Sequence, residues 1–222
     1  EGVFKVTRGG SHNTPVEYLR SANRMGTLPE DKHWLIGFRV ILGELPTTKP
    51  LPRPEPKLWA QNIQQSKHDW SNGPDPDTPY FQGPIQFVRI PENRETIPMY
   101  DHNHCPSITW CPNGDLLAVW FSTIRERGRE MTILANRLRY GNDQWDFPAE
   151  FFKAPDRNMT GSSLLNNGEN TIYHFNGMET AGMWANLALV MRTSTDNGVS
   201  WSRPRLINSK HQPRNQVISG TF

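Results

Sequence analysis

The stretch of the chain with the most chemically active residue types is 125–130, which reads Arg-Glu-Arg-Gly-Arg-Glu. Glutamates can donate or accept a proton during catalysis, and arginines bind carboxylates through two parallel hydrogen bonds. Arginine also outnumbers lysine in the whole chain, at 17 to 7. These residue types could hold an acidic substrate and act on it. The alternative is a charged loop whose side chains pair with one another in solvent.

A second polar stretch, Asp101-His102-Asn103-His104, places two histidines on one face of an expected strand. A metal ion could use both, but the sequence offers no third ligand beside them. We therefore expect no metal and no cofactor. A structural or substrate-binding role is the preferred interpretation.

The two cysteines, Cys105 and Cys111, are separated by a β-rich stretch that precedes a Pro-Asn-Gly turn. Six steps along a strand span about 20 Å, whereas the Cα atoms of a disulfide lie within about 7 Å. We expect two free thiols, both buried as small core residues.

Residues 194–201 read Ser-Thr-Asp-Asn-Gly-Val-Ser-Trp and match the Asp-box pattern S-x-D-x-G-x-[ST]-W at every fixed position. The carboxylate of Asp196 can accept hydrogen bonds from its own turn, and Gly198 can adopt a positive φ. The motif predicts a structural role, not a catalytic one, for Ser194, Asp196, Gly198 and Trp201.

The elements that must position these residues are short strands separated by turn signals. Alternation and turn chemistry predict strands over 107–110, 116–121, 131–138, 162–165, 172–175 and 187–193. Two Trp-x-x-Pro elements begin at Trp145 and Trp201 and so repeat after about 56 residues, and four strands per period of this order are typical of a propeller. Residues 84–222 are expected to form the first two to three blades.

The composition narrows the classes of partner. A formal net charge of +2 leaves no electrostatic footprint for nucleic acid, and no apolar run approaches the roughly 18 residues of a membrane span. The chain has 19 prolines and 17 glycines, which suits strands and turns better than a helix bundle. Prolines at the start of residues 46–83 predict a Pro-rich linker or loop there.

Residues 101–222 resemble the sialidase (neuraminidase) superfamily, in its branch of BNR-repeat-like sialidases. The resemblance rests on His104-Cys-Pro-Ser-Ile, Pro112-Asn-Gly-Asp-Leu-Leu-Ala-Val-Trp-Phe and Arg125-Glu126. These stretches correspond, with ungapped spacing, to H-A-S-T-I, P-N-G-D-L-L-A-x-W-F and R-E of that branch. The resemblance implies a mainly β fold, part of a six-bladed β-propeller.

The same resemblance implies roles for individual residues. Glu130 occupies the position of the family's acid/base aspartate, and Glu126 is the competing acid. Arg125 matches an early arginine that binds the substrate or orients the acid, and His104 matches an early histidine. Residues at the starts of blades that could contact sugar hydroxyls, or simply lie in loops between blades, are Arg157, Asn158, Arg214 and Asn215.

The resemblance further implies a sialidase-like glycoside hydrolase, exo-acting on sialylated or other acidic glycans. The alternatives are a propeller-type polysaccharide lyase on uronate polymers, which His104 and Arg125 would suit, and a non-catalytic glycan-binding protein. The family's tyrosine nucleophile and later arginines have no matched positions, so we expect this chain alone to be inactive. A secreted, periplasmic or cell-surface location is expected from the family.

Residues 1–45 are similar to the C-terminal end of the formylglycine-generating-enzyme (sulfatase-modifying-factor) family. The similar stretches are Arg8-Gly-Gly-Ser, Leu19-Arg-Ser-Ala-Asn-Arg and Gly37-Phe-Arg-Val. The resemblance implies the tail of a C-type-lectin-like α/β domain before the propeller. The family's catalytic cysteines would fall near Thr14 and Leu19, so a structural or binding role is expected.

Overall fold

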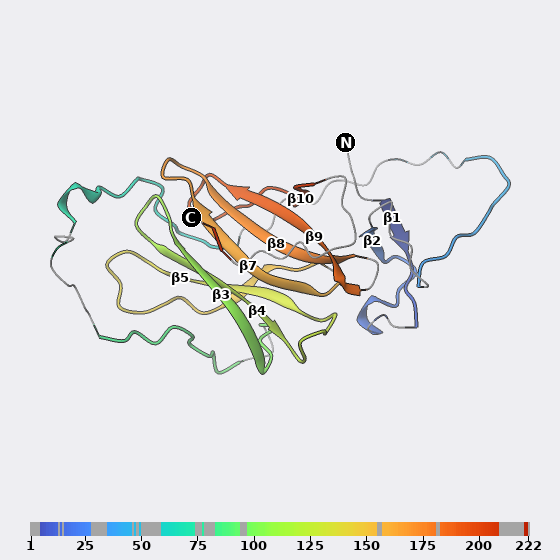
Figure 1. The fold of residues 1–222 in the computed structure, drawn as a ribbon, viewed down its shortest axis with the longest axis horizontal. Coiled ribbons are helices and arrows are strands. Elements are labelled where there is room, and N and C mark those ends of the chain that lie inside the picture. The colour runs from blue at the N-terminus through green and yellow to red at the C-terminus, as the bar shows by residue number, and fades with distance from the viewer. Residues whose placement is uncertain are drawn as a thin grey trace.

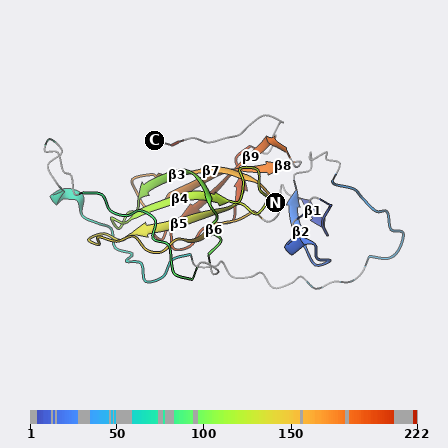
Figure 2. The same ribbon diagram turned by 90° about the horizontal axis from the view of Figure 1, so that it is seen from below.

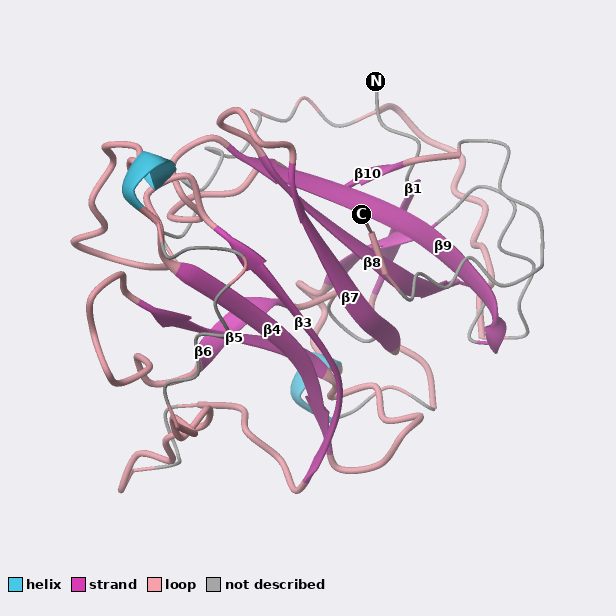
Figure 3. Ribbon diagram, turned by 60° about the vertical axis from the view of Figure 1, so that its left-hand side comes forward, coloured by secondary structure: helices cyan, strands magenta, loops and turns pink. Residues whose placement is uncertain are grey.

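The computed structural model describes residues 5–12, 14, 16–27, 35–45, 47, 49, 59–73, 77, 83–93, 97–154, 157–180, 183–208 and 220–221. Figure 3 shows that strands dominate this part of the chain. Its helical elements are two three-residue 3-10 turns, η1 (Val16–Tyr18) and η2 (Trp70–Asn72). In these ranges no helix is long and apolar enough to cross a membrane. The predicted mainly β class is confirmed.

Two four-stranded antiparallel sheets form the body of the molecule, and within each the strands pair in chain order. The first sheet contains β3 (His102–Trp110), β4 (Leu116–Thr123), β5 (Thr132–Leu138) and β6 (Ala149–Phe152). The second contains β7 (Met159–Asn166), β8 (Ile172–Thr180), β9 (Met183–Ser194) and β10 (Arg205–Leu206). A sequential four-stranded meander is the unit of a propeller, so we call the sheets the first and second blade.

The connections between strands gather at two opposite ends, because neighbouring strands run in opposite directions. The β3–β4, β5–β6, β7–β8 and β9–β10 connections lie at what we call the Asp-box end. The β4–β5 and β8–β9 connections and the link from β6 to β7 lie at the other end, the loop end. Figures 1 and 2 show η2 toward one end of the molecule and the hairpin of β1 (Lys5–Arg8) and β2 (Arg24–Thr27) toward the other.

The hydrophobic core joins the two blades. Side chains alternate between the faces of a strand, and β4 is buried on both. Leu117, Val119 and Phe121 enter the core cluster, while Trp120 on the opposite face contacts Phe87, with ring centroids 5.4 Å apart. The remaining core members include Ile133, Ala135, Phe151, Phe152, Met159, Leu164, Ile172 and Val190.

The first strands of the two blades lie side by side and are linked by a repeating contact. The backbone N–H of Leu164 in β7 donates to Oγ of Ser107 in β3 at 3.0 Å. Oγ1 of Thr221 donates in turn to the carbonyl of Leu164 at 2.8 Å. Each contact joins residues 57 positions apart, which agrees with the predicted repeat of about 56 residues.

The predicted strands are present, but their bounds differ. β3 begins five residues before the predicted 107–110 and continues through a bulge between His104 and Ser107. β6 and β10 were not predicted, since strands of four and two residues have too little alternation to detect.

Both cysteines are free, as predicted, but the expectation that both are buried is wrong for Cys105. Cys105 lies in the β3 bulge with φ of 51°, a left-handed conformation that takes its side chain out of the strand's alternation. Cys111 is buried, and burial raises the pKa of its thiol to about 11.

The segments that precede the blades pack on them where the structure describes them. Residues 59–73 lie along the Asp-box end: the N–H of Trp59 donates to the carbonyl of Val199, and the N–H of His68 to that of Pro112, at 3.1 and 2.8 Å. The assignment of residues 1–45 to a formylglycine-generating-enzyme-like tail stays a prediction.

Candidate active site

The β4–β5 loop, residues 124–131, crosses the loop end of the first blade and contains most of the predicted catalytic residues. Its backbone is closed by contacts with the carbonyl of Arg125. The N–H of Gly128 donates to that carbonyl at 2.7 Å, and Oγ1 of Thr123 lies 2.8 Å from it. The exposed side chains of Arg125 and Glu126 therefore extend from a fixed backbone turn.

The carboxylate of Glu130 folds back over this loop. Its Oε1 accepts hydrogen bonds from Oγ1 of Thr123 and from the N–H of Ile124, both at 2.8 Å. It also lies over Gly128, where an added Cβ would collide with it. Burial works to raise the pKa of Glu130, but the hydrogen bonds outweigh burial and lower the pKa below its ordinary value. A general acid needs the opposite shift, so this geometry suits a residue that holds the loop.

The β3 bulge brings Cys105 and His104 to the same end of the blade. Burial, and next the negative charge of Glu126, raise the pKa of Cys105, which places that carboxylate near the bulge. His104 is exposed and packs against Phe121, with ring centroids 5.5 Å apart. Sγ of Cys105 lies 4.0 Å from Nδ1 of His104, so the bulge brings these two neighbours together at the loop end.

Asn158 acts as a tether between the blades in the structure. Its side-chain Nδ2 donates to the carbonyls of Gly128 and Glu126 at 2.9 and 3.2 Å. Its N–H donates to Oε2 of Glu179 at 2.9 Å, and its carbonyl accepts from the Glu179 N–H at 2.8 Å. Asn158 is buried, so it fixes the 124–131 loop from the second blade. The other two predicted sugar contacts, Arg214 and Asn215, lie outside the described residues.

A cavity of about 920 Å³ opens between the N-terminal segment and this end of the blades. Four arginines are among the residues that line it, and no aspartate or glutamate is among the lining residues that the structure describes. The arginines are Arg8 and Arg39 from the N-terminal segment, and Arg129 and Arg157 from the blades. Nη2 of Arg157 also donates to Oγ1 of Thr27 at 3.0 Å, which joins the β1–β2 hairpin to the second blade. A volume of this order accommodates a ligand larger than one sugar.

Sequence reasoning did not assign Arg8, Arg39 or Arg129 to a site, and it named Arg157 only as a blade-starting residue that could contact sugar hydroxyls. Arg129 lies in the charged 125–130 stretch and Arg157 precedes Asn158, so both lie next to residues that the sequence pattern singled out. These four arginines come together only because the N-terminal hairpin packs against the blades, and the sequence pattern does not predict that packing.

The Asp-box lies at the opposite end and has the contacts of a closed turn. Oδ1 of Asp196 accepts from Oγ of Ser194 at 2.7 Å and from the N–H of Ser200 at 3.0 Å. Gly198 has φ of 79°, and its carbonyl accepts from Nε1 of Trp201 at 3.1 Å. Burial works to raise the pKa of Asp196, but these hydrogen bonds lower it overall.

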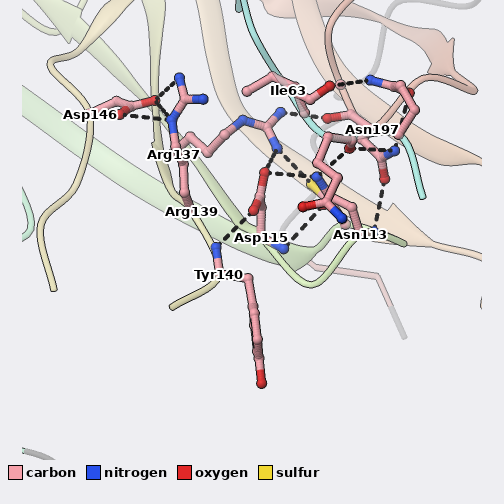
Figure 4. Close-up of polar contacts among 12 residues, drawn as sticks. Ile63, Asn113, Asp115, Arg137, Arg139, Tyr140, Asp146 and Asn197 are labelled. Carbon is pink, nitrogen blue, oxygen red and sulfur yellow. Dashed lines mark hydrogen bonds and ion pairs between the residues drawn. The ribbon is translucent and has the colours of Figure 1, made fainter. Parts of the chain in front are cut away.

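A buried ion pair joins the two blades beside the Asp-box (Figure 4). Nη1 of Arg137 lies 2.8 Å from Oδ2 of Asp115, and both side chains are almost fully buried. Nη2 of Arg137 donates to the carbonyl of Asn197 in the Asp-box turn at 2.5 Å. Oδ1 of Asn197 accepts from the N–H of Asn113 at 3.0 Å. Sequence reasoning did not predict this pair, because its contacts join three separate segments: the β3–β4 turn, β5 and the Asp-box turn.

A second buried cation lies inside the second blade. Nδ1 of His174 accepts from Nε and Nη2 of Arg192, both at 3.1 Å, and its Nε2 lies 2.8 Å from Oγ of Ser162. Burial lowers the pKa of His174 well below 6.5, and lowers that of Arg192 to about 9. The guanidinium lies 4.5 and 4.4 Å from the ring centroids of Phe151 and Phe152. These contacts assign the cluster to the core of the blade.

The His102 and His104 rings stack with centroids 5.0 Å apart. Across the described ranges, no group of three histidine, cysteine, aspartate or glutamate side chains is arranged to hold a metal ion.

Comparison with known families gives one match. Residues 114–221 match the model of the BNR repeat-like domain. The match covers a little under half of the chain, and this part of it is similar to the BNR repeat-like domain. The matched residues include the 124–131 loop, Asn158 and the Asp-box, whereas His104 lies before the matched region.

Among solved structures, the chain is similar to Hadza microbial sialidase Hz136, with 18% sequence identity and a TM-score of 0.42. The similar region covers 50% of this chain and 27% of that one, so it spans about a quarter of the sialidase. No curated protein matches the chain.

Proposed function

We propose that the blades belong to a sialidase-like glycoside hydrolase that acts on acidic glycans. The observation that carries this proposal is the cavity between the N-terminal segment and the loop end of the blades, which Arg129 of the candidate catalytic loop lines, while Arg125, Glu126, Glu130 and His104 are not among its described lining residues. Guanidinium groups bind carboxylates through paired hydrogen bonds, and a cavity without a lining carboxylate among the described residues favours an anionic ligand electrostatically. The similarity of residues 114–221 to the BNR repeat-like domain, together with the resemblance of the sequence motifs to BNR-repeat-like sialidases, supports the same substrate class.

Within this proposal the two glutamates of the loop have different tasks. Glu126 is exposed on a backbone anchored by Asn158, so it can approach a substrate as the acid. Glu130 is held by Thr123 and Ile124 with a lowered pKa, so it stays ionised and positions the loop. Arg125 is exposed beside Glu126 and would bind the substrate carboxylate.

The test uses the protein in its natural form and a fluorogenic sialoside. Arg125→Ala should lower kcat/KM by more than about tenfold, because an arginine–carboxylate contact is lost. Glu126→Gln should lower mainly kcat and remove the alkaline limb of the pH–rate profile, because an acid must be protonated to act. Glu130→Gln should lower kcat but leave that limb in place. Arg203→Ala, an exposed arginine near the Asp-box, is the matched control and should keep wild-type rates.

A polysaccharide lyase is the second candidate, and the exposed His104 at the loop end of the first blade favours it. A neutral histidine could remove the proton beside a uronate carboxylate, after which the leaving oxygen departs and a C=C bond forms. Incubation with a uronate polymer distinguishes the two, since only a lyase generates the ultraviolet absorbance of an unsaturated sugar. Tight binding of both substrates without turnover of either would instead establish a non-catalytic glycan-binding protein.

A further inference from the structure

Four aromatic rings form a continuous cluster at the Asp-box end, opposite the candidate active site. We call His68, Trp70, Trp110 and Tyr140 the aromatic platform. The ring centroids are 4.0 Å apart for His68 and Tyr140, 4.4 Å for His68 and Trp70, and 5.2 Å for Trp70 and Trp110. The rings come from three segments: residues 59–73, the end of β3, and the β5–β6 connection.

The platform is unusually open to solvent. Tyr140 is 58% exposed, and Trp70 and Trp110 are each 49% exposed. Isolated exposed aromatic residues are common, but a contiguous exposed group marks a binding surface. The negative faces of aromatic rings attract C–H groups that carry partial positive charge, and a pyranose ring presents such groups on its flat face.

The platform is held rigidly from below. The N–H of Tyr140 donates to Oδ1 of Asp115 at 2.8 Å, and Asp115 is paired with the buried Arg137. Figure 4 shows the Tyr140 ring directed away from this polar cluster. His68 and Tyr140 lie so close over Gly114, which has φ of 93°, that a Cβ there would come within 3.1 Å of both. A preorganised surface loses little conformational entropy when it binds.

A pocket of about 340 Å³ adjoins the platform, with Tyr140 and His68 in its wall. The remaining lining side chains are rich in hydrogen-bonding groups, and both charge signs are present. They include Asn62, Gln64, Ser66, Lys67, Asp69, Arg139 and Asn142. Amides and hydroxyls suit a ligand with many hydroxyl groups, and the mixed charges give no preference for an anion. The volume is at the lower end for small-molecule sites.

We propose that the aromatic platform and its pocket bind a neutral sugar of one to three residues. A ring of the sugar stacks on Tyr140 or Trp70 while its hydroxyls bond with the pocket wall. This site goes beyond the proposed hydrolase, because it lies at the other end of the blades and needs neither an acidic sugar nor a catalytic acid.

Titration of the isotope-labelled 222-residue chain tests the proposal, with lactose and triacetylchitotriose as separate probes. The indole N–H signals of Trp70 and Trp110 should move saturably with at least one sugar, while that of Trp201 should stay in place. Tyr140→Ala should weaken binding about tenfold, because the stacking contact is lost. Tyr140→Phe, which keeps the ring, should bind within about twofold of wild type. Phe147→Ala is the matched control, since Phe147 is also 49% exposed and lies on the same β5–β6 connection.

The sugar-binding proposal would be wrong if neither sugar produced saturable shifts, or if Tyr140→Ala bound the sugars as tightly as wild type. It would also be wrong if the signals shifted with protein concentration in the absence of sugar, because a second copy of the chain would then cover the platform. If Tyr140→Ala does not fold, Trp70→Ala replaces it, because Trp70 lies on a surface segment. Glu126→Gln should bind the sugars normally, so failure of the hydrolase proposal leaves this result unaffected.

Discussion

At the scale of single residues, two ion pairs of the same chemistry lie in contrasting environments. Arg137–Asp115 is buried, whereas the Arg139–Asp146 side chains are 33% and 38% exposed. Removal of one partner from a buried pair leaves an uncompensated charge. We expect Asp115→Asn to lower the free energy of unfolding by about 3 kcal/mol, measured by urea denaturation.

The exposed pair is the control for this prediction. Asp146→Asn should cost less than about 1 kcal/mol, because solvent screens the pair. The double variant Asp115→Asn/Arg137→Met should recover part of the stability, because it removes the charge that Asp115→Asn leaves behind. Equal costs for the two single variants would contradict the assigned role of the buried pair.

His174 predicts a dependence of stability on acid. Burial, and next the positive charge of Arg192, hold the pKa of His174 well below 6.5. His174 of the unfolded chain therefore binds a proton near pH 6.5, whereas His174 of the folded chain stays neutral. Its contribution to the free energy of unfolding is complete above that pH and is lost as the pH falls below it. Stability should fall by about 1.4 kcal/mol for each pH unit below 6.5.

Urea denaturation of wild type and His174→Gln between pH 7.5 and 5 measures this dependence. The substitution removes the titrating group, so the difference between the two slopes isolates His174 from the exposed histidines. Parallel slopes would show that His174 does not contribute.

At the scale of elements, the contact between β3 and β7 depends on a glycine facing the bulge. A Cβ at Gly161 would overlap the Cβ of Cys105, which is too close to the backbone to move freely. Gly161→Ala should lower the free energy of unfolding by about 1–3 kcal/mol, as overpacking does. Gly43→Ala is the control, since nothing lies within 4 Å of its added Cβ.

Cys105→Gly should restore the stability of Gly161→Ala. The substitution removes the overlapping Cβ and relieves the left-handed backbone of Cys105, which costs a side-chain-bearing residue about 1 kcal/mol. A double-mutant cycle by thermal denaturation measures this coupling. If the effects of the two substitutions on the free energy of unfolding were additive, Cys105 and Gly161 would not be coupled, which would contradict the predicted contact.

The elements also show where sequence reasoning succeeds. β4, β5, β8 and β9 were predicted because they are long enough to have clear alternation between turn signals. The 124–131 loop was predicted because its charged residues follow one another in the sequence. The Asn158 tether could not be predicted as such, because its contacts with Glu126 and Gly128 span 32 and 30 residues and require the blades to be in place.

At the scale of the whole molecule, the two thiols report on different events. Cys105 is exposed, whereas Cys111 is buried with a pKa raised to about 11. With a chromogenic disulfide reagent at pH 8, one equivalent should react with the folded chain, in a first and more rapid phase, and the second only when urea unfolds the chain. Cys105→Ser should abolish the rapid phase alone. Two rapid equivalents in native buffer would contradict the burial of Cys111.

The docking of segments far apart in the chain is the part of the molecule least visible in sequence. The arginine cavity needs both the β1–β2 hairpin and the blades, and the aromatic platform needs residues 59–73 and the β5–β6 connection. Each segment has ordinary surface residues on its own. These residues can form a binding site only when tertiary packing brings the segments next to one another.

The contacts that join Ser107, Leu164 and Thr221 make the blade a unit suited to gene duplication. Both contacts span 57 residues, so an in-frame copy of one such unit would keep the same spacing, although Ser107 accepts from the Leu164 N–H and Thr221 donates to the Leu164 carbonyl. A single-residue insertion inside β3 or β7 would shift those contacts out of register and turn apolar side chains outward. An insertion in the β4–β5 loop would leave the register unchanged. Lineages descended from this fold should therefore accumulate length variation in that loop while the strand spacing stays constant.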